Sequence, residues 1–372
     1  MAVDASSPSP SGSRRRRRLV VAGVVALAMT TASGAAWPVL SPQVQRVRAL
    51  ADMKDRPNER SLTDGGRGTN ILLMGVDSRA GVSDQEKQEF HAGGAACHCT
   101  DVLMLVHVSA SRDRVSVVGL PRDSYALIPA HPDRVTGQPV PPRPGKINAA
   151  FAQGGAPLSV RTVEDMTHIR IDHYLQLDFR RFIDAVDLVG GVEVCTTYRL
   201  KDSATKLDLA PGRHLLSGGG ALQYVRSRHV DAGADFGRIQ RQQRFLVAGL
   251  RKLAEHTTLF RPFALPRLAR TVLGATETDQ GLSLPELTTL IWRLRELPPS
   301  ATEFMTVPIS GFRPPADGIG STIVWDRAEA GAVFADLAAD RPLTSADPDA
   351  HFPDPPRMGN STPVRGNTLA CS

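Results

Sequence analysis

Three short apolar runs in the first third of the chain have the length and composition of buried β-strands. Asn70–Val76 is NILLMGV, Val102–Val108 is VLMLVHV and Val115–Leu120 is VSVVGL. Segments of this length that are apolar at nearly every position are typical of strands buried on both faces of a sheet. We therefore predict three strands of one central sheet in this part of the chain.

Helical periodicity alternates with further strands downstream. Apolar residues recur at helical spacing in Phe179–Val189, which follows a predicted strand at Asp172–Leu177 and precedes another at Val192–Cys195. More helices are predicted from Gly145, where Lys146 would begin the first one, and in the second half of the chain. This alternation predicts an α/β fold, a three-layer α/β/α sandwich with a mostly mixed central sheet.

The first forty residues have a different pattern. Arg14–Arg18 precede Leu19–Leu40, a stretch without a charged residue that is long enough to cross a hydrocarbon core of roughly 30 Å as one helix. The arginines predict a cytoplasmic N-terminus and an extracellular main domain. A cleaved signal peptide is the alternative, because Leu19–Met29, the most apolar part, is short and small residues follow it. The predicted parts are a basic tail (1–18), a transmembrane signal-anchor (19–40), a stalk (41–68), the main domain (69–312) and a partly irregular extension (313–372).

Composition narrows the class of protein. The formal net charge of the 372 residues is +6, of which Arg14–Arg18 supply five, so the remainder is close to neutral and nucleic-acid binding is not indicated. Four cysteines are compatible with an oxidising exterior. Cys97 and Cys99 flank a histidine, yet the sequence has no second spaced pair for a zinc site, so a disulfide is favoured. Cys195 with Cys371 is the preferred pairing, although the sequence does not fix the connectivity.

Charged residues adjoin the three predicted N-terminal strands. Asp77 follows the first strand, Asp101 directly precedes the second, and the pair Arg122 and Asp123 follows the third. Ligands of open α/β sheets bind at such a sheet edge, so we expect Asp77 and Asp101 to meet there. Two neighbouring carboxylates suit a hard cation such as Mg²⁺. Ordinary capping acids are the alternative interpretation.

A second concentration of charge lies in Ala221–Gln243. Its cationic and amide side chains form two groups on either side of a predicted break near residues 231–234: Arg226 and Arg228, then Arg238, Arg241 and Gln242 at helical spacing. Guanidinium groups that converge across a turn suit a polyanion, because each fork matches two phosphate oxygens. A solvated basic helix face is the alternative. Lys146 is a further sign of an anion site, since a cation at a predicted helix start opposes the helix dipole.

Taken together in this order, the motifs resemble the LytR-CpsA-Psr family. They are GVDSR (Gly75–Arg79), Thr100–Asp101, PRDS (Pro121–Ser124), KINAAF (Lys146–Phe151), LVGGVEV (Leu188–Val194) and the arginine-rich stretch. The resemblance covers about residues 69–256. It implies a membrane-anchored phosphotransferase of the cell envelope. Such an enzyme moves a glycopolymer from a polyprenyl diphosphate carrier to peptidoglycan, onto the 6-hydroxyl of N-acetylmuramic acid.

The resemblance also implies residue roles. Asp77 and Asp101 would hold Mg²⁺ at the diphosphate and, with Arg122, form the catalytic centre. The other implied substrate-binding residues are Arg79, Asp123, Lys146, Arg226, Arg228, Arg238, Arg241 and Gln242. The lipid tail would lie in an apolar pocket between sheet and helices. The sequence departs from the family at Cys99, which stands where the family commonly has an arginine. Loss of that arginine would change the rate of the reaction more than the type of reaction.

The implied chemistry agrees with the residue types. Phosphoryl transfer needs positioning and positive charge at the phosphate oxygens, which a metal ion and several arginines supply. The sequence does not choose a general base among Asp77, Asp101 and Asp123. Two rival functions keep the same site: a hydrolase that uses water as the acceptor, and a non-catalytic scaffold that binds anionic wall polymers.

Overall fold

The computed structural model describes residues 68–92, 99–254, 264–273, 283–294, 296–315, 318–344, 350–351 and 361–369. These residues belong to one compact unit within residues 46–372. The predicted tail, membrane span and stalk lie outside the described residues, as do Cys97, His98 and Cys371. Among the described residues, no helix combines the length and hydrophobicity that crossing a membrane requires.

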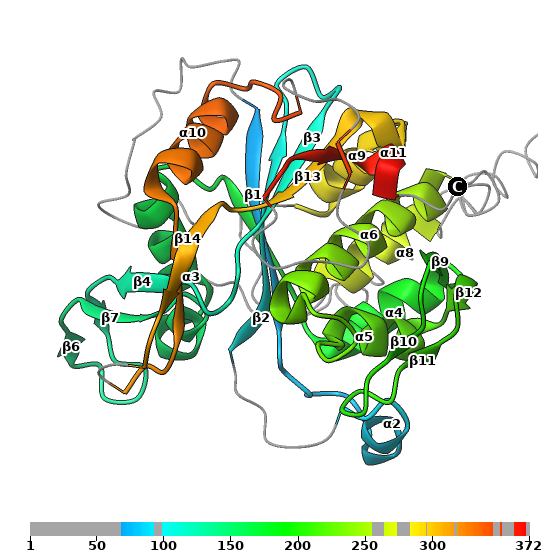
Figure 1. Cartoon of the computed structure of the whole chain (residues 1–372), viewed down its shortest axis with the longest axis horizontal. Helices are drawn as coiled ribbons and strands as arrows, with labels where there is room; N and C mark the ends of the chain where they lie inside the picture. Colours follow the sequence, from blue (N-terminus) through cyan, green and yellow to red (C-terminus); the bar gives the residue numbers. More distant parts are fainter. Residues whose placement is uncertain are drawn as a thin grey trace, which may run out of the picture. The chain divides into compact units, whose positions relative to one another are not determined.

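A six-stranded mixed sheet forms the centre of this unit (Figure 1). The strand order is β16-β13-β3-β2-β1-β8; the β1–β8 and β3–β13 pairs are parallel and the other three are antiparallel. The strands are β1 (Thr69–Val76), β2 (Thr100–Val108), β3 (Val115–Gly119), β8 (His173–Leu177), β13 (Thr302–Thr306) and β16 (Val364–Arg365). The predicted mixed α/β architecture is therefore confirmed, as are the three predicted N-terminal strands.

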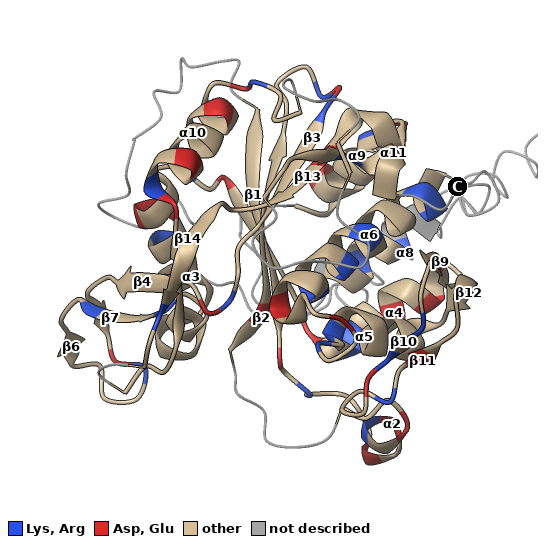
Figure 2. Ribbon diagram, viewed as in Figure 1, with Lys and Arg blue, Asp and Glu red and all other residues tan. Residues whose placement is uncertain are grey.

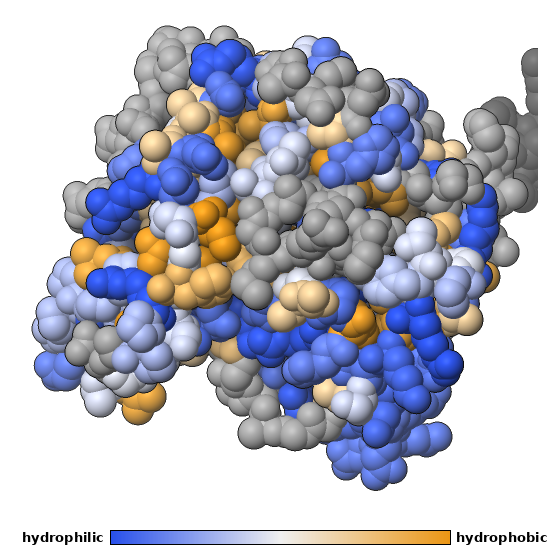
Figure 3. All heavy atoms as spheres, viewed as in Figure 1, coloured by the Kyte–Doolittle hydropathy of each residue, from blue (hydrophilic) through white to orange (hydrophobic). Residues whose placement is uncertain are grey.

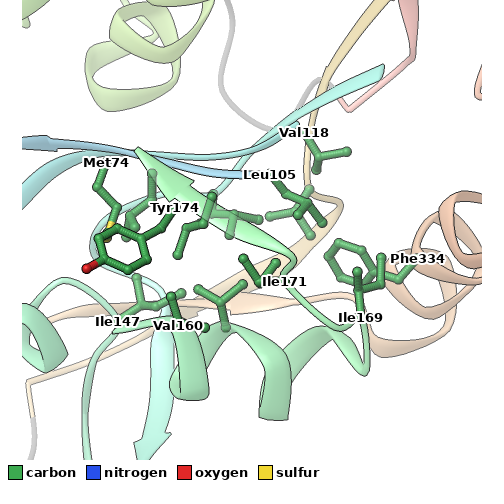
Figure 4. Close-up of a cluster of buried hydrophobic side chains, with 14 of the residues drawn as sticks. Met74, Leu105, Val118, Ile147, Val160, Ile169, Ile171, Tyr174 and Phe334 are labelled. Atoms are coloured by element: carbon green, nitrogen blue, oxygen red, sulfur yellow. The ribbon is translucent and has the colours of Figure 1, made fainter. Parts of the chain in front are cut away.

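Helices pack on both faces of the sheet, in keeping with the predicted three layers. One face carries α3 (Ala149–Thr167) and α10 (Arg327–Ala338), and the other carries α6 (Ala234–Ala254) and α9 (Leu284–Leu294). Strand alternation explains this, because Leu72 and Met74 of β1 pack toward α3 whereas Leu73 packs toward α6. Figure 4 shows the first of these clusters, in which Met74 lies near side chains of α3.

The sequence located the helix α3 correctly but placed its start too early. A kink at Gly155, whose φ is 69°, divides α3 into two helical segments. Lys146, however, does not begin this helix. It is the last residue of strand β7 (Arg143–Lys146), and Asn148 is the N-cap of α3. The argument that Lys146 opposes a helix dipole was therefore wrong.

The helical layer beside α6 includes further elements that shape the site. These are α4 (Phe179–Leu188), α5 (Gly218–Arg226) and α8 (Ala264–Leu273), with β9 (Val192–Thr196), β10 (Leu200–Lys201), β11 (Asp208–Leu209) and β12 (Gly212–Leu216). The short elements η2 (Pro299–Ala301) and α11 (Gly366–Leu369) complete this side. The chain leaves the helical conformation between α5 and α6, so the predicted break in the arginine-rich stretch is confirmed.

Several short elements were not predicted. A lobe beside α3 consists of β4 (Tyr125–Ile128), β5 (His131–Pro132), β6 (Pro139–Val140) and β7, and the hairpin of β14 (Ile309–Arg313) and β15 (Thr322–Trp325) lies against it (Figure 1). The segment between β1 and β2 contains α2 (Asp84–Glu89), which begins with a capping box between Ser83 and Glu86.

Candidate active site

The predicted charged residues of the sheet edge do come together. Asp77 directly follows β1, and its backbone N–H donates to the carbonyl of Cys99 at 3.1 Å, which fixes it beside the start of β2 where Asp101 lies. Arg122 follows β3, and its guanidinium is hydrogen-bonded to the Asp101 carboxylate. Antiparallel pairing of β1 with β2 and of β2 with β3 thus brings three separate motifs to one edge.

Arg122 is surrounded by carboxylates. Besides its bond to Asp101, its Nε lies 3.5 Å from Asp235 Oδ2 and 3.9 Å from Asp123 Oδ2. Burial favours the neutral guanidine, but the charges of Asp101, Asp235 and Asp123 outweigh it and raise the pKa of Arg122. Its Nε is buried and has no hydrogen-bond partner among the described residues. The guanidinium is held in place with a donor still unused.

Asp235, in the first turn of α6, holds the arginines of the second motif and was not predicted as a site residue. Its carboxylate accepts from Arg228 Nε at 2.6 Å and pairs with Arg238 Nη2 at 3.3 Å. Burial acts to raise its pKa, yet the charges of Arg238, Arg228 and Arg122 lower the pKa of Asp235 overall. Its position three residues before Arg238 at a predicted helix start was the signal that could have identified it.

Burial lowers the pKa of two arginines of the cluster, the buried Arg238 and the half-buried Arg226. The Arg238 side chain is 4% exposed, and burial lowers its pKa to about 10, a value at which it is still a cation at neutral pH. Burial likewise lowers the pKa of Arg226, whose guanidinium lies 4.7 Å from the centre of the Phe179 ring. A bound anion would stabilise both guanidinium groups and raise their pKa values, because it would add negative charge beside them.

The site as a whole carries an excess of positive charge (Figure 2). Arg79 forms two hydrogen bonds with Asp77, at 3.0 and 3.1 Å, and Lys146 Nζ lies 3.0 Å from Asp123 Oδ1. Six cationic side chains therefore gather with four carboxylates: Arg79, Arg122, Lys146, Arg226, Arg228 and Arg238 with Asp77, Asp101, Asp123 and Asp235. This balance favours a doubly or triply charged anion.

Arg241 and Gln242 hold the loop between α5 and α6 rather than joining this group. Arg241 pairs with the buried Asp231 and donates to the Ser227 carbonyl at 2.6 Å, and Gln242 Nε2 donates to the Val225 carbonyl at 3.0 Å. Gln242 also lines the cavity described below. The structure thus gives Arg241 a positioning role, whereas the sequence predicted phosphate contact.

Asp202 anchors the same loop from outside the predicted motifs. Its carboxylate accepts from the backbone N–H groups of Arg228 at 2.7 Å and His229 at 3.0 Å. Burial would raise its pKa, but hydrogen bonds from four backbone N–H groups lower the pKa of Asp202 to about 2. Arg228 is therefore positioned at its backbone by Asp202 and at its side chain by Asp235.

An apolar cavity of about 470 Å³ opens onto the charged group. Its lining includes Asp101, Arg122, Arg226, Arg228 and Arg238 of this group, together with the carboxylates Asp178 and Asp202. Its apolar lining comes from the sheet face and from α4, α6 and α8, including Leu73, Val102, Met104, Phe182, Val186, Phe245 and Leu268. The predicted apolar pocket between sheet and helices is present, and its shape and lining suit a molecule with an anionic head and a hydrocarbon tail.

The predicted metal pair has a mixed outcome. Asp77 is bound by Arg79 and Asp101 by Arg122, and within the described ranges no three His, Cys, Asp or Glu side chains gather as a metal-binding group. Mg²⁺ often takes one or two protein carboxylates and completes its shell with phosphate oxygens and water. Two carboxylates at this edge fit that donor set. Cys99 beside them is disulfide-bonded, and its pairing lies outside the described residues.

The sequence was compared with protein families and curated proteins. The model of the LytR_cpsA_psr family matches residues 43–334. A probable cell wall biosynthesis protein LcpB of Corynebacterium glutamicum is 34% identical over 272 residues, which cover 73% of this chain and 61% of that protein. The polyisoprenyl-teichoic acid–peptidoglycan teichoic acid transferase TagU of Bacillus cereus is 33% identical over 190 residues, or 51% of this chain and 54% of that one. The chain therefore matches well under two thirds of the length of these relatives.

Solved structures with a similar fold include two whose names carry this family's name. A LytR-Csp2A-Psr enzyme from Actinomyces oris aligns with a TM-score of 0.56 and 23% identity, over 80% of this chain and 97% of that chain. A LytR-CPS2A-psr protein, YwtF (TagT), with bound octaprenyl pyrophosphate lipid aligns with a TM-score of 0.53 and 22% identity, over 79% and 99%. At these identities the alignments establish a shared fold.

Proposed function

The chain belongs to the LytR-CpsA-Psr family, and on that premise we propose that it transfers a glycopolymer from a polyprenyl diphosphate carrier to peptidoglycan. The observation that carries this proposal is the joining of a cationic group to an apolar cavity. A diphosphate needs several guanidinium forks, and a polyprenyl chain needs an apolar channel beside them. The relative TagU is named as a transferase of this type, and the TagT structure of the same fold holds a polyprenyl pyrophosphate.

The donor would bind with its two halves in different parts of the site. Its diphosphate would lie against Arg122, Arg226, Arg228 and Arg238, which line the cavity and outnumber the two carboxylates, Asp101 and Asp235, among them. Its hydrocarbon chain would lie between the sheet face and α4, α6 and α8. Each methylene buried in this way contributes about 0.8 kcal/mol, so the tail supplies affinity and the head supplies orientation.

The reaction replaces the anhydride bond of the diphosphate with a phosphodiester bond. The 6-hydroxyl oxygen of N-acetylmuramic acid attacks the phosphorus that carries the glycopolymer and forms a new P–O bond. The bond from that phosphorus to the bridging oxygen breaks, and polyprenyl phosphate leaves with the electron pair. The hydroxyl proton passes to a carboxylate. Charge on the phosphate oxygens increases toward the transition state, and the arginines are already placed to stabilise it.

Asp123 is the proposed base. Both carboxylate oxygens of Asp77 are bonded by Arg79, and Asp101 is bonded by Arg122. Asp123 has Lys146 on Oδ1 at 3.0 Å, while its Oδ2 lies 3.9 Å from Arg122 Nε, beyond hydrogen-bond distance. That oxygen can accept a proton without breaking an existing hydrogen bond to Arg122.

Mg²⁺ is proposed as the cofactor. Asp77 and Asp101 would hold it, and when bound it would neutralise charge on the diphosphate. We also propose that Leu19–Leu40 anchors the chain in the cell membrane with the N-terminus in the cytoplasm, so that the site faces the peptidoglycan. Protease accessibility of residues on either side of this segment in intact cells tests that orientation.

The test of the function is a transfer assay. The purified full chain is mixed with Mg²⁺, a short-chain polyprenyl diphosphate sugar and an uncrosslinked peptidoglycan glycan, and the products are identified by mass spectrometry. A sugar phosphate joined to the glycan, absent with chelator and in Arg122→Ala, supports the proposal.

Two other outcomes would replace it. Release of sugar phosphate without joining, even with excess glycan, would favour the hydrolase. Tight binding of the lipid without turnover, retained in Asp101→Asn, would favour the non-catalytic scaffold.

A further inference from the structure

A second surface adjoins the site through the unpredicted hairpins. The β14–β15 hairpin docks directly on the residues that follow Arg122: Ile323 N–H donates to the Asp123 carbonyl at 2.9 Å, and Trp325 Nε1 donates to Ser124 Oγ at 2.8 Å. Strand β4 starts at the next residue, Tyr125. Two segments almost two hundred residues apart in sequence are therefore fixed to the backbone of the proposed base.

The outward side of this lobe has a defined chemistry. Strand alternation buries Ala126 and Ile128 and turns Tyr125 and Leu127 outward, so that Leu127 is 58% exposed. The Arg313 guanidinium lies 4.3 Å from the centre of the Tyr125 ring. We call the surface made of Tyr125, Leu127, Pro144, Lys146 and Arg313 the Tyr125 face.

Its members share one side of the β4–β7 ladder. Lys146 is the cross-strand partner of Tyr125, and Pro144 is the partner of Leu127. Paired residues of an antiparallel ladder point to the same face, so Lys146 points to the side of Tyr125 while its ammonium reaches Asp123. Figure 3 shows hydrophobic atoms gathered over the region of β14 beside hydrophilic ones. The Tyr125 face is thus connected to the proposed base through Lys146.

The chemistry of this face suits an amino-sugar chain that bears carboxylates. An aromatic ring and apolar side chains pack against the C–H face of a pyranose, and Tyr125, Leu127 and Pro144 offer such a surface. The cations Arg313 and Lys146 complement carboxylates. A peptidoglycan glycan presents both features, because each N-acetylmuramic acid carries a lactyl group that ends in a carboxylate or a peptide.

Reaction geometry places the acceptor on this side. In-line displacement requires the attacking oxygen and the leaving oxygen on opposite sides of the phosphorus. The leaving lipid phosphate would lie toward the cavity, beside Arg226, Arg228 and Arg238. Asp123 adjoins Arg122 and carries Lys146, and neither Asp123 nor Lys146 is part of the cavity lining.

From these observations we infer that the Tyr125 face binds the glycan strand of peptidoglycan and presents its hydroxyl group to Asp123. The inference rests on the proposed transferase function and adds the site of its acceptor. Asp123 and Lys146 form the boundary between this face and the donor site.

The experiment separates acceptor from donor. The full chain is compared with Leu127→Asp and Arg313→Ala, with Leu215→Asp as a matched control because Leu215 is 66% exposed on β12, outside both surfaces. Affinity for a tetrasaccharide of alternating N-acetylglucosamine and N-acetylmuramic acid is measured by calorimetry without donor. The KM for acceptor and the KM for donor are then measured in the transfer assay.

We expect both variants to weaken tetrasaccharide binding and to raise the acceptor KM by about ten-fold, with an unchanged donor KM and an unaffected Leu215→Asp. Lost tetrasaccharide binding in the two variants would support the Tyr125 face as the glycan site, whether or not the wild type catalyses transfer. Failure of the wild type to catalyse transfer would count only against the proposed transferase function. An unchanged tetrasaccharide affinity in both variants, or an equal change in the control, would overturn the inference.

Discussion

Charged side chains gather at both ends of the central sheet, and the two groups differ in how they are balanced. At one end lies the arginine cluster, defined as Arg122, Arg226, Arg228 and Arg238 with Asp101 and Asp235. At the other lies the far-end network, defined as His107, Arg114, Glu303 and Asp340. Both contain buried charge, so burial alone does not tell a binding site from a structural one.

The far-end network is nearly balanced in charge. Asp340 accepts from Arg114 Nη2 at 2.6 Å and from the N–H of Ala110 at 3.0 Å, and it lies 3.1 Å from His107 Nε2. Glu303 accepts from the side chains of Ser116 and Thr344, each at 2.6 Å. Two basic side chains, Arg114 and His107, face the two carboxylates. Each carboxylate accepts several hydrogen bonds.

The arginine cluster is open by comparison. Four arginines face two acids, and burial lowers the pKa of Arg238 to about 10. Unused donors do not separate the two groups, because the Nε atoms of Arg122, Arg238 and also Arg114 lack a hydrogen-bond partner among the described residues. The comparison teaches that a surplus of cations over carboxylates beside a cavity, rather than unused donors, distinguishes the site.

The largest expected effect comes from removing the central donor. Arg122→Ala should lower kcat/KM for transfer by about 10³-fold, because a guanidinium that stabilises phosphoryl transfer contributes on that scale. The melting temperature should change little, because Asp235 still forms ion pairs with Arg228 and Arg238. Transfer rates and thermal unfolding on the same preparations check both statements. A large loss of stability with a nearly unchanged rate per folded molecule would contradict the contrast.

The matched change at the far end should do the reverse. Arg114→Ala removes the Asp340 and Glu303 partner and should lower the free energy of unfolding by about 2–4 kcal/mol, because it leaves carboxylates partly uncompensated in a buried site. Chemical denaturation measures the loss. The transfer rate of the molecules that stay folded should equal that of the wild type, and a rate as low as that of Arg122→Ala would show that the two ends are coupled.

A third change tests the arrangement within the cluster. Asp235→Asn keeps the size of the side chain but removes the charge that holds Arg228, Arg238 and Arg122. We expect about a ten- to hundred-fold lower kcat/KM, since misplaced donors stabilise the transition state less. Asp231→Asn is the comparison, because Asp231 holds Arg241 in the same loop without belonging to the cluster. Equal losses in both variants would mean that the loop as a whole matters and that Asp235 has no special part.

The smallest expected effect is a pH dependence. The pKa of Asp202 is lowered from 3.8 to about 2 in the folded protein, so its contribution to stability is complete above about pH 4 and is lost as the pH falls toward 2. Asp202→Asn should therefore show a shallower loss of stability between pH 4 and pH 2 than the wild type. Unfolding curves across that range measure the two slopes, and parallel slopes would contradict the assigned pKa.

The sequence predicted what depends on local pattern. The strands β1, β2 and β3 are apolar at nearly every position, and the break between α5 and α6, at residues 227–233, includes most of the predicted segment 231–234. We could also predict that Asp77, Asp101 and Arg122 lie close together, because each adjoins the end of one of these neighbouring strands. These features needed only periodicity and the motifs that flank it.

The parts that were missed depend on partners distant in sequence or on very short segments. β5 and β6 have two residues each and contain prolines, so they have no strand periodicity. β14 and β15 are fixed by docking on Asp123 and Ser124, which no local pattern records. The Ser83 capping box, by contrast, was visible in the sequence and would have identified α2.

The central claim is that the surplus charge binds a lipid diphosphate whose tail fills the cavity. The most direct measurement is the affinity of the full chain for a short-chain polyprenyl diphosphate, compared with the matching monophosphate and alcohol and repeated with Arg226→Ala. We predict the tightest binding for the diphosphate, a loss of at least about ten-fold in the variant, and little change in the variant for the alcohol. Equal affinity for all three molecules, unaffected by Arg226→Ala, would contradict the claim.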